Sequence, residues 1–244
     1  MKTYTKSFLS ICLVAASFGA TAQATTINGE LNITGSVTVT ATTIDFQPGG
    51  GTDGLFQVDP FSQTGFFNLG GLPGSLGAVK DLDVIAQPVD DFGFTTGTGP
   101  LLNFLLFAAN PALKFDLLFI QSGAGTLADC ALPAAGGQVC TITGSPFTLT
   151  NTSTTSSTAS FRVRGTVDDG GPVSTFVGEF STQFPTQNLQ EVLATLGSAG
   201  SITKSFAGTF VVTAIPEPGT TSLLVAGSIL LLVGRFMRSR SSKA

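Results

Sequence analysis

The chain has 244 residues, of which 42% are hydrophobic and 11% are charged, and it contains no histidine. The length is sufficient for one domain with a sizeable core, and the lack of histidine excludes Ser-His-Asp and Cys-His catalytic arrangements. Between Thr25 and Ile215, fourteen acidic residues outnumber five basic ones. Nucleic-acid binding requires the opposite charge balance, so we expect no nucleic-acid partner.

Residues 1–24 are typical of a secretory signal peptide. Lys2 and Lys6 form a charged start, and the mostly apolar stretch 8–20 follows them. Ala22 and Ala24 form an A-x-A cleavage motif. We therefore expect export through the inner membrane and cleavage after Ala24.

The exported body, residues 25–213, has a dominant period of two. The segments at 31–46, 161–167 and 204–214 alternate apolar or small residues with polar ones, as antiparallel strands with one wet face do. The segments "LLNFLLFA" and "LKFDLLFIQ" are nearly continuous apolar runs, which predicts buried central strands. Clusters of Gly and Pro separate the strand candidates. The pattern predicts an all-β ectodomain, an antiparallel β-sandwich or jelly-roll-like domain.

One segment has the helical period instead. In "TQNLQEVLATLG", Leu189, Val192, Leu193 and Leu196 fall on one helical face. Asn188 and Glu191 are spaced as a capping pair, and Gly197 is expected to end the helix. We expect a short amphipathic helix that covers the core.

Cleavage of the signal peptide leaves two cysteines, Cys130 and Cys140. In an oxidising compartment the simplest outcome is a structural disulfide. Closing a loop of this length is expected to stabilise the folded chain by about 3 kcal/mol, because it restricts the unfolded chain. A redox pair would favour the tighter C-x-x-C spacing, and zinc would need more ligands than the chain offers without histidine. We predict the disulfide.

Paired aspartates are the remaining candidates for chemistry. They are Asp81 with Asp83, Asp90 with Asp91, and Asp168 with Asp169. Two carboxylates could form a glycosidase site, but loop aspartates more often stabilise turns, and "DDGG" between two strands is typical of a hairpin. We expect no catalytic residues, no cofactor and no enzyme activity. Calcium is the alternative, because "GGGTDG", "PVDDFG" and "VDDGG" combine carboxylates with backbone carbonyls, although none has EF-hand spacing.

The segment 148–161, "TLTNTSTTSSTASF", is too rich in Ser and Thr for a core strand and predicts a solvated loop or edge. Asn32 and Asn151 each start a glycosylation sequon. The body also contains many phenylalanines but no Trp or Tyr, since Tyr4 lies in the signal peptide. Sugar binding on an aromatic platform is therefore disfavoured.

The C-terminal segment 214–244 differs from the rest of the chain. Pro216, Glu217 and Pro218 precede an apolar stretch, about 219–234, that as a helix would span about 24 Å. Arg235, Arg238, Arg240 and Lys243 follow directly. Such positive charge stays on the cytoplasmic side of a membrane, so we expect a short transmembrane helix with the body outside.

These three parts, in this order, resemble the PEP-CTERM sorting domain of exported bacterial proteins. The resemblance covers only about the last thirty residues. It implies that an exosortase-type membrane protease recognises Pro216, Glu217 and Pro218, and that the helix contacts membrane lipid until the tail is processed. It also implies an association with exopolysaccharide and biofilm matrix.

We therefore expect a non-enzymatic surface or extracellular-matrix protein. It would be anchored by its C-terminal helix before processing and lie at the cell surface or outside the cell afterwards. The alternative is a calcium- or polysaccharide-binding module on the cell surface.

Overall fold

The computed structural model describes residues 26–47, 53–69, 71–83, 87, 99–215 and 228. The chain divides into two units, Met1–Ala214 and Ile215–Ala244. The fold described below is that of the first unit.

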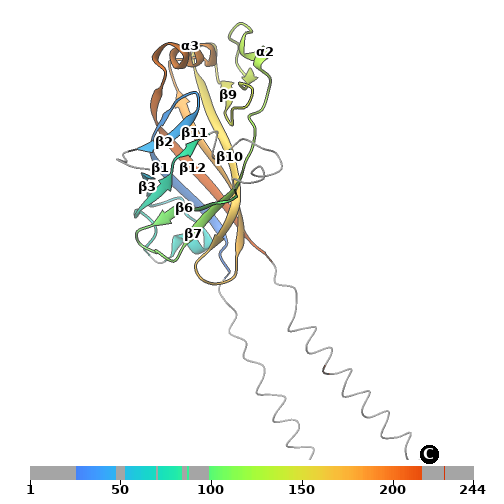
Figure 1. The fold of residues 1–244 in the computed structure, drawn as a ribbon. Helices are drawn as coiled ribbons and strands as arrows, with labels where there is room; N and C mark the ends of the chain where they lie inside the picture. The colour runs from blue at the N-terminus through green and yellow to red at the C-terminus, as the bar shows by residue number, and fades with distance from the viewer. Residues whose placement is uncertain are drawn as a thin grey trace, which may run out of the picture. The chain divides into compact units, whose positions relative to one another are not determined.

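The described elements are mostly strands (Figure 1). The strands are β1 (Gly29–Val39), β2 (Thr43–Gln47), β3 (Asp53–Val58), β4 (Leu76–Lys80), β5 (Leu82–Asp83), β6 (Leu101–Phe107), β7 (Lys114–Ile120), β8 (Val139–Cys140), β9 (Thr148–Asn151), β10 (Ser157–Asp168), β11 (Ser174–Phe184) and β12 (Ile202–Ala214). The helices are the 3₁₀ turn η1 (Gly65–Asn68), α2 (Leu127–Cys130) and α3 (Leu189–Ala199).

Eight of these strands form a closed antiparallel barrel. In chain order β1, β3, β4, β6, β7, β10, β11 and β12 each pair with the next, and β12 pairs with β1 along the whole length of β1. The β11–β12 connection carries α3, which crosses one end of the barrel (Figure 1). We call this end the helix end.

The barrel differs from the expected sandwich or jelly roll. Both architectures give the same alternation of buried and exposed residues along each strand, and the strand pattern was predicted correctly as antiparallel β. The difference depends on which strands pair, and here the last strand returns to the first. Sequence periodicity carries no information about that long-range pairing, so it could not separate the two.

Phenylalanine fills the barrel interior. The inward-facing rings form edge-to-face, tilted and stacked contacts. Phe180 touches Phe46, Phe104, Phe161, Phe206 and Phe210 at centroid distances of 4.8–6.1 Å. Several strand glycines lie directly opposite these rings, among them Gly178 opposite Phe210 and Gly165 opposite Phe176. The glycines provide the space that the rings occupy, so small and large residues alternate across neighbouring strands.

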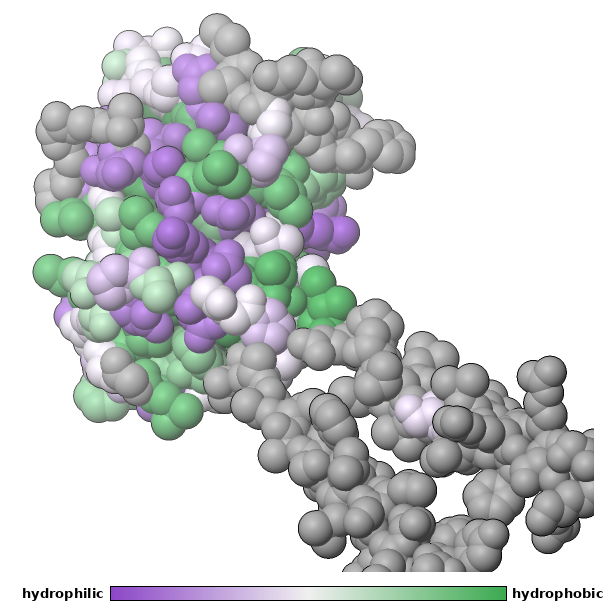
Figure 2. Space-filling model, turned by 60° about the horizontal axis from the view of Figure 1, so that its bottom comes forward, coloured by the Kyte–Doolittle hydropathy of each residue, from purple (hydrophilic) through white to green (hydrophobic). Residues whose placement is uncertain are grey.

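The two apolar runs do not form strands buried on both faces. In β6 and β7, Leu102 is 54% exposed and Leu118 is 39% exposed, because no second layer covers the outer wall of the barrel at these residues. Other strands also place aliphatic side chains on the outside, such as Leu55, Leu76, Val177 and Val211. Figure 2 shows that hydrophilic and hydrophobic side chains are interspersed on one face of the molecule.

The predicted helix is present as α3, and its capping pair is confirmed. The Asn188 side chain accepts a hydrogen bond from the Glu191 backbone N–H, and the Glu191 carboxylate accepts one from the Asn188 N–H. Leu189 and Val192 are buried beneath the helix, as expected for a cover. The predicted end at Gly197 is wrong: the helix continues to Ala199, and Gly200 caps it at φ 77°, a left-handed conformation that favours glycine.

Strand pairing changes along the barrel axis. Toward the helix end, Ser157–Ser160 of β10 pairs with β9, and Ser36–Val39 of β1 pairs with β2, which in turn pairs with β5. Farther from the helix, β10 pairs with β7 and β1 pairs with β3. Near the helix end the described strands therefore run from β8 to β5 without a pairing that joins these two edges.

Candidate functional site

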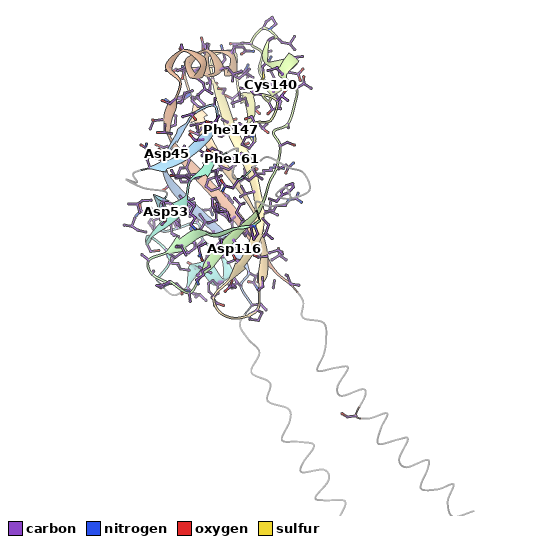
Figure 3. The ribbon with its side chains drawn as sticks, in the orientation of Figure 1. Asp45, Asp53, Asp116, Cys140, Phe147 and Phe161 are labelled. Carbon is purple, nitrogen blue, oxygen red and sulfur yellow. A yellow bond between two sulfur atoms is a disulfide. The ribbon has the colours of Figure 1, made fainter. Side chains whose placement is uncertain are left out.

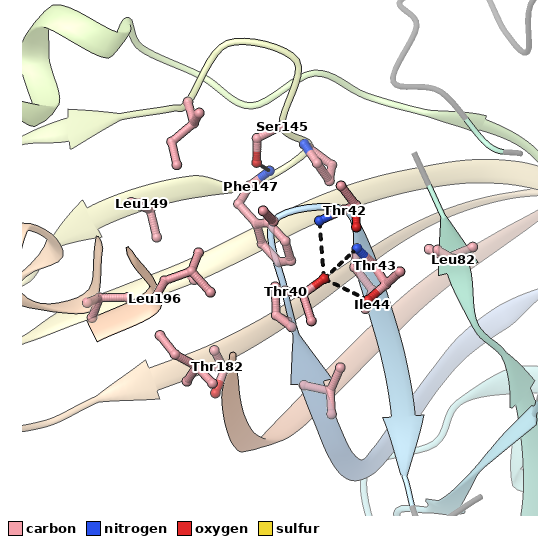
Figure 4. A pocket seen from close by; sticks show the side chains of 18 of the residues that line it. Thr40, Thr42, Thr43, Ile44, Leu82, Ser145, Phe147, Leu149, Thr182 and Leu196 are labelled. Atoms are coloured by element: carbon pink, nitrogen blue, oxygen red, sulfur yellow. Dashed lines mark hydrogen bonds between the residues drawn. The ribbon is translucent and has the colours of Figure 1, made fainter. Parts of the chain in front are cut away.

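A cavity of about 210 Å³ lies beside this seam at the helix end (Figure 4). One wall comes from β5 and its continuation, with Leu82, Asp83 and Gln87, and the opposite wall from the loop 142–147. Helix α3 contributes Val192, Leu193 and Leu196. The cavity exists where the barrel wall changes partners, so the fold itself places it.

The inner end of the cavity rests on aromatic rings. A smaller cavity of about 30 Å³ lies next to it, bounded by Phe46, Phe161, Phe180 and Phe206. The two cavities share the lining residues Val37, Val39, Ile44, Phe147, Ala159 and Thr182. Phe161 and Phe180 stack with centroids 4.8 Å apart and an interplanar angle of 9°. Phe147 meets the Phe161 ring edge-on at 5.4 Å, and Figure 3 shows these two residues side by side.

Much of the side wall is formed by inward-facing residues that are smaller than phenylalanine. In β10, Ala159 takes the inward position next to Phe161, and in β11 Thr182 takes the one next to Phe180. Val37 and Val39 do the same in β1. The cavity thus follows from the sequence: the ring-bearing inward positions are succeeded by small and aliphatic ones.

Several hydroxyl groups of the lining already have protein partners. Thr40 Oγ1 accepts hydrogen bonds from the N–H groups of Thr42 and Thr43 at 3.2 and 3.0 Å, and it bonds the Thr43 hydroxyl at 2.8 Å (Figure 4). Thr182 Oγ1 donates to the Ser205 carbonyl at 2.6 Å. These bonds leave the cavity interior largely apolar in character.

Among the described lining residues the charged ones are Asp83 and Lys204. Lys204 lies opposite Val37 and shares the inward alternation of β12 with Phe206 and Phe210, yet it is exposed, so it stands at the mouth. Its Nζ lies 5.7 Å from the centroid of the Phe184 ring. A cation at an inward-facing position of a barrel strand is a departure from the pattern of the other inward residues.

The predicted disulfide is confirmed, and it lies at the helix end. Cys130 of α2 and Cys140 of β8 are bonded, with Cα atoms 5.2 Å apart. Both pack in a small cluster with Leu149, Phe184 and Leu189. The bond therefore holds the segment 127–140 against the elements that surround the cavity.

Asn151 joins the same region through hydrogen bonds. Its side chain is fully buried; Oδ1 accepts from the Leu189 N–H at 2.7 Å, and Nδ2 donates to Gln138 Oε1 at 3.0 Å and Gln190 Oε1 at 3.3 Å. The sequon at Asn151 is thus a structural asparagine in the folded chain. Asn32 is half-buried, and its Nδ2 donates to Glu30 and to the Ser62 carbonyl.

The expectation of a solvated loop or edge is correct for only part of the Ser/Thr-rich segment. Residues 152–156 form the turn between β9 and β10, but β9 pairs with both β8 and β10, and Ser157–Ser160 of β10 pairs with both β9 and β11. Ser153 and Thr152 hydroxyls each bond the Ser156 hydroxyl at 2.7 Å. The segment is therefore ordered by its own side chains.

The structure does not bring the described candidate aspartates together as an acid pair in the cavity. Asp168 and Asp169 accept hydrogen bonds from the Gly170 and Gly171 N–H groups, which confirms the hairpin expected from "DDGG". Asp83 lines the cavity, and Asp81 lies just before β5. Asp90 and Asp91 lie outside the described residues.

Burial raises the pKa of Asp81. Desolvation is the main cause, and the nearby charges of Asp45 and Asp53 act in the same direction, while a hydrogen bond from the Phe46 N–H at 2.8 Å opposes them. Figure 3 shows Asp45 and Asp53 on neighbouring strands. Elsewhere, hydrogen bonds from Thr126 lower the pKa of Asp129, and hydrogen bonds from Phe61 and Ser62 lower that of Asp59.

Metal-binding side-chain groups and membrane-spanning helices were both assessed for the described part of the chain. No three His, Cys, Asp or Glu side chains are grouped there so that they could hold a metal ion. No helix there is long and apolar enough to cross a membrane.

The sorting and cleavage residues all lie outside the described residues. They are Ala22, Ala24, Pro216, Glu217, Pro218, Arg235, Arg238, Arg240 and Lys243. The expected helix at 219–234 falls there too, apart from Ser228. The functional expectations at the two ends of the chain therefore remain predictions from sequence.

Sequence reasoning did not find the cavity. One signal was present: in "KSFAGTFVVTA", Lys204 has the same parity as Phe206 and Phe210, which puts a charge on the core face. The partner change between strands, by contrast, had no local signature.

No family model, no curated protein and no solved structure matches the chain.

Proposed function

We propose that this chain is an exported, non-enzymatic surface or matrix protein, delivered by a PEP-CTERM-type tail and associated with exopolysaccharide. The observation that carries the proposal is the order of three parts in the C-terminal sequence: Pro216-Glu217-Pro218, then the apolar stretch, then the arginines. The same chain also starts with a signal-peptide pattern. The tail's partners are an exosortase-type protease and membrane lipid.

The described body supports an oxidising destination. Cys130 and Cys140 are joined, and structural disulfides persist outside the cytoplasm. The acidic surface inferred from fourteen acids against five bases favours solubility there.

A non-enzymatic role is supported by the residue types and hydrogen bonds of the described chain. The chain has no histidine, Asp168 and Asp169 accept hydrogen bonds within their turn, and Asp81 accepts one from the Phe46 N–H. The cavity walls carry aliphatic and hydroxyl groups whose hydrogen bonds are directed to the protein. Binding and structural roles do not require histidine or a pair of catalytic carboxylates.

The test of sorting uses the native producer and intact-mass measurement of the mature protein. We expect a mass that lacks residues 1–24 and the segment beyond the Pro-Glu-Pro motif. In the variant Glu217→Ala we expect the tail to remain and the protein to stay with the membrane fraction. Thr220→Ala, a change three residues away, is the matched control and should be processed normally.

Two results would contradict the proposal. One is a mature surface protein that retains its full tail. The other is a reporter fused behind Ala244 that is found outside the cell, because the basic end is expected in the cytoplasm. Retention of the purified body on the producer's own exopolysaccharide tests the matrix association separately.

A further inference from the structure

The helix-end cavity has the features of a ligand site. Its volume of about 210 Å³ exceeds the roughly 150 Å³ of an engineered apolar cavity that accepts benzene. On the same scale it has room for about eight carbon atoms. Eight-stranded barrels of this kind are wide enough to hold one small ligand where side chains do not fill them.

The lining determines which part of a ligand fits inside. Ile44, Leu82, Leu149, Ala159 and Val192 are buried and present carbon atoms to the cavity. The hydroxyls of Thr40 and Thr182 are directed into hydrogen bonds with the protein. A polar ligand group placed against these carbon atoms would lose its hydrogen bonds to water without replacement, so the lining favours a ligand whose inner part is apolar.

The residues at the mouth of the cavity determine which head group the ligand carries. Lys204 projects from an inward-facing position of β12 and is exposed, and no described acid forms a salt bridge with it. Its ammonium lies against the Phe184 ring, which places it near the cavity wall. On the β5 side, Asp83 already has an interaction of its own. The positive charge available at the mouth therefore belongs to Lys204.

We propose that the cavity binds a free amphiphile with one aliphatic chain of about eight carbons and a carboxylate head. The chain packs toward Phe161 and Phe180, and the head lies at Lys204. The cavity volume selects a single short chain. This inference concerns the barrel alone and is independent of how the protein is sorted.

The experiment titrates the mature protein, with its disulfide intact, with sodium octanoate and with 1-octanol by isothermal calorimetry. We expect saturable one-to-one binding of both, with a dissociation constant on the order of 0.1 mM for octanoate. The variant Ala159→Leu fills the cavity from β10 and should weaken both ligands at least about tenfold. Ala194→Leu, on the exposed side of α3, is the matched control and should bind normally.

A second pair of variants tests the head group. Lys204→Gln should weaken octanoate by about two- to fivefold, as expected for an exposed charge pair, and leave octanol unchanged. Lys114→Gln removes an exposed lysine that does not line the cavity and should change neither affinity. If Ala159→Leu fails to fold, Leu196→Phe at the mouth serves the same purpose.

Absence of saturable binding of both ligands, or binding that neither Ala159→Leu nor Leu196→Phe weakens, overturns the site. Octanoate binding that Lys204→Gln leaves unchanged overturns the head-group assignment. Normal sorting of a protein that binds neither ligand would refute this inference while leaving the proposed function intact.

Discussion

Gly178 of β11 lies directly opposite Phe210 of β12, and the Phe210 ring occupies the space where a side chain at position 178 would begin. A Cβ atom there would lie 2.5 Å from two ring atoms of Phe210 and 2.9 Å from Cγ2 of Val163. The Phe210 ring is fully buried and touches Phe115, Phe176 and Phe180. The ring cannot move without displacing others.

Gly178→Ala is therefore expected to destabilise the barrel by about 1–3 kcal/mol, the usual cost of overpacking a core. Urea unfolding followed by far-UV circular dichroism measures this change. Gly197→Ala is the matched control, because Gly197 lies in α3 with open space around it. The control should raise stability by up to about 1 kcal/mol, since alanine favours a helix. Equal effects at the two positions would show that the Phe210 contact does not constrain the barrel.

Gly178 also illustrates what the sequence could and could not predict. The alternation in β10, β11 and β12 was visible in the sequence, as were the Asn188–Glu191 capping pair and the Cys130–Cys140 bond, because each depends on residues near one another in the chain. The closure of the barrel depends on β1 pairing with β12, which are the first and last strands. No local pattern encodes that pairing, so a sandwich was an equal solution.

The second prediction concerns Asn151, which satisfies an N–H group at the first turn of α3. Asn151→Ala removes the acceptor of the buried Leu189 N–H and two hydrogen bonds to Gln138 and Gln190. An unsatisfied buried donor costs about 1–3 kcal/mol, so we expect a loss of that size in unfolding free energy. Hydrogen exchange of the Leu189 and Gln190 amides should accelerate more than exchange in β11.

The control for this variant is Gln183→Ala, at an exposed position of β11. It should change stability by less than about 0.5 kcal/mol. In the wild-type protein, the intact mass should show no sugar at Asn151, since its amide nitrogen is buried. A glycan at that residue would contradict the structural role.

The third prediction concerns the disulfide. The double variant Cys130→Ser, Cys140→Ser is expected to lose about 3 kcal/mol of stability, because the bond restricts the unfolded chain. The bond packs beside Leu149 and Leu189, so the change should loosen the helix end first. Hydrogen exchange should therefore rise in β8, β9 and α3 before it rises in the β10–β11 hairpin. A uniform rise over the whole barrel would argue against this local role.

The cavity was beyond sequence reasoning for a different reason. Its walls come from β5, the loop 142–147, α3 and β12, which are distant in the chain. Each of these segments resembles an ordinary strand, helix or loop when considered alone. The one anomaly, Lys204 on the inner face, acquires meaning only when Ala159 and Thr182 are seen to leave space beside it.

The last prediction is a pH dependence at Asp81. Its pKa lies above the ordinary value of 3.8 because burial and the charges of Asp45 and Asp53 disfavour ionisation. The folded protein therefore binds a proton at this site more tightly than the unfolded chain does, and stability falls as pH rises from about 4 through the raised pKa. Above that window the ionised carboxylate is a constant cost to the fold.

Asp81→Asn keeps an oxygen that accepts the Phe46 N–H but removes the charge. We expect a higher melting temperature than the wild type at pH 7, and a difference that narrows as pH falls towards 4, because the wild-type carboxyl takes up a proton over that range and loses its charge. Asp116→Asn is the matched control. It also keeps an oxygen that accepts the Asn103 N–H, but Asp116 is not one of the three carboxylates Asp45, Asp53 and Asp81. Thermal melts of the three proteins from pH 4 to pH 7 measure the effect. A constant difference across that range would show that the charge on Asp81 does not oppose folding.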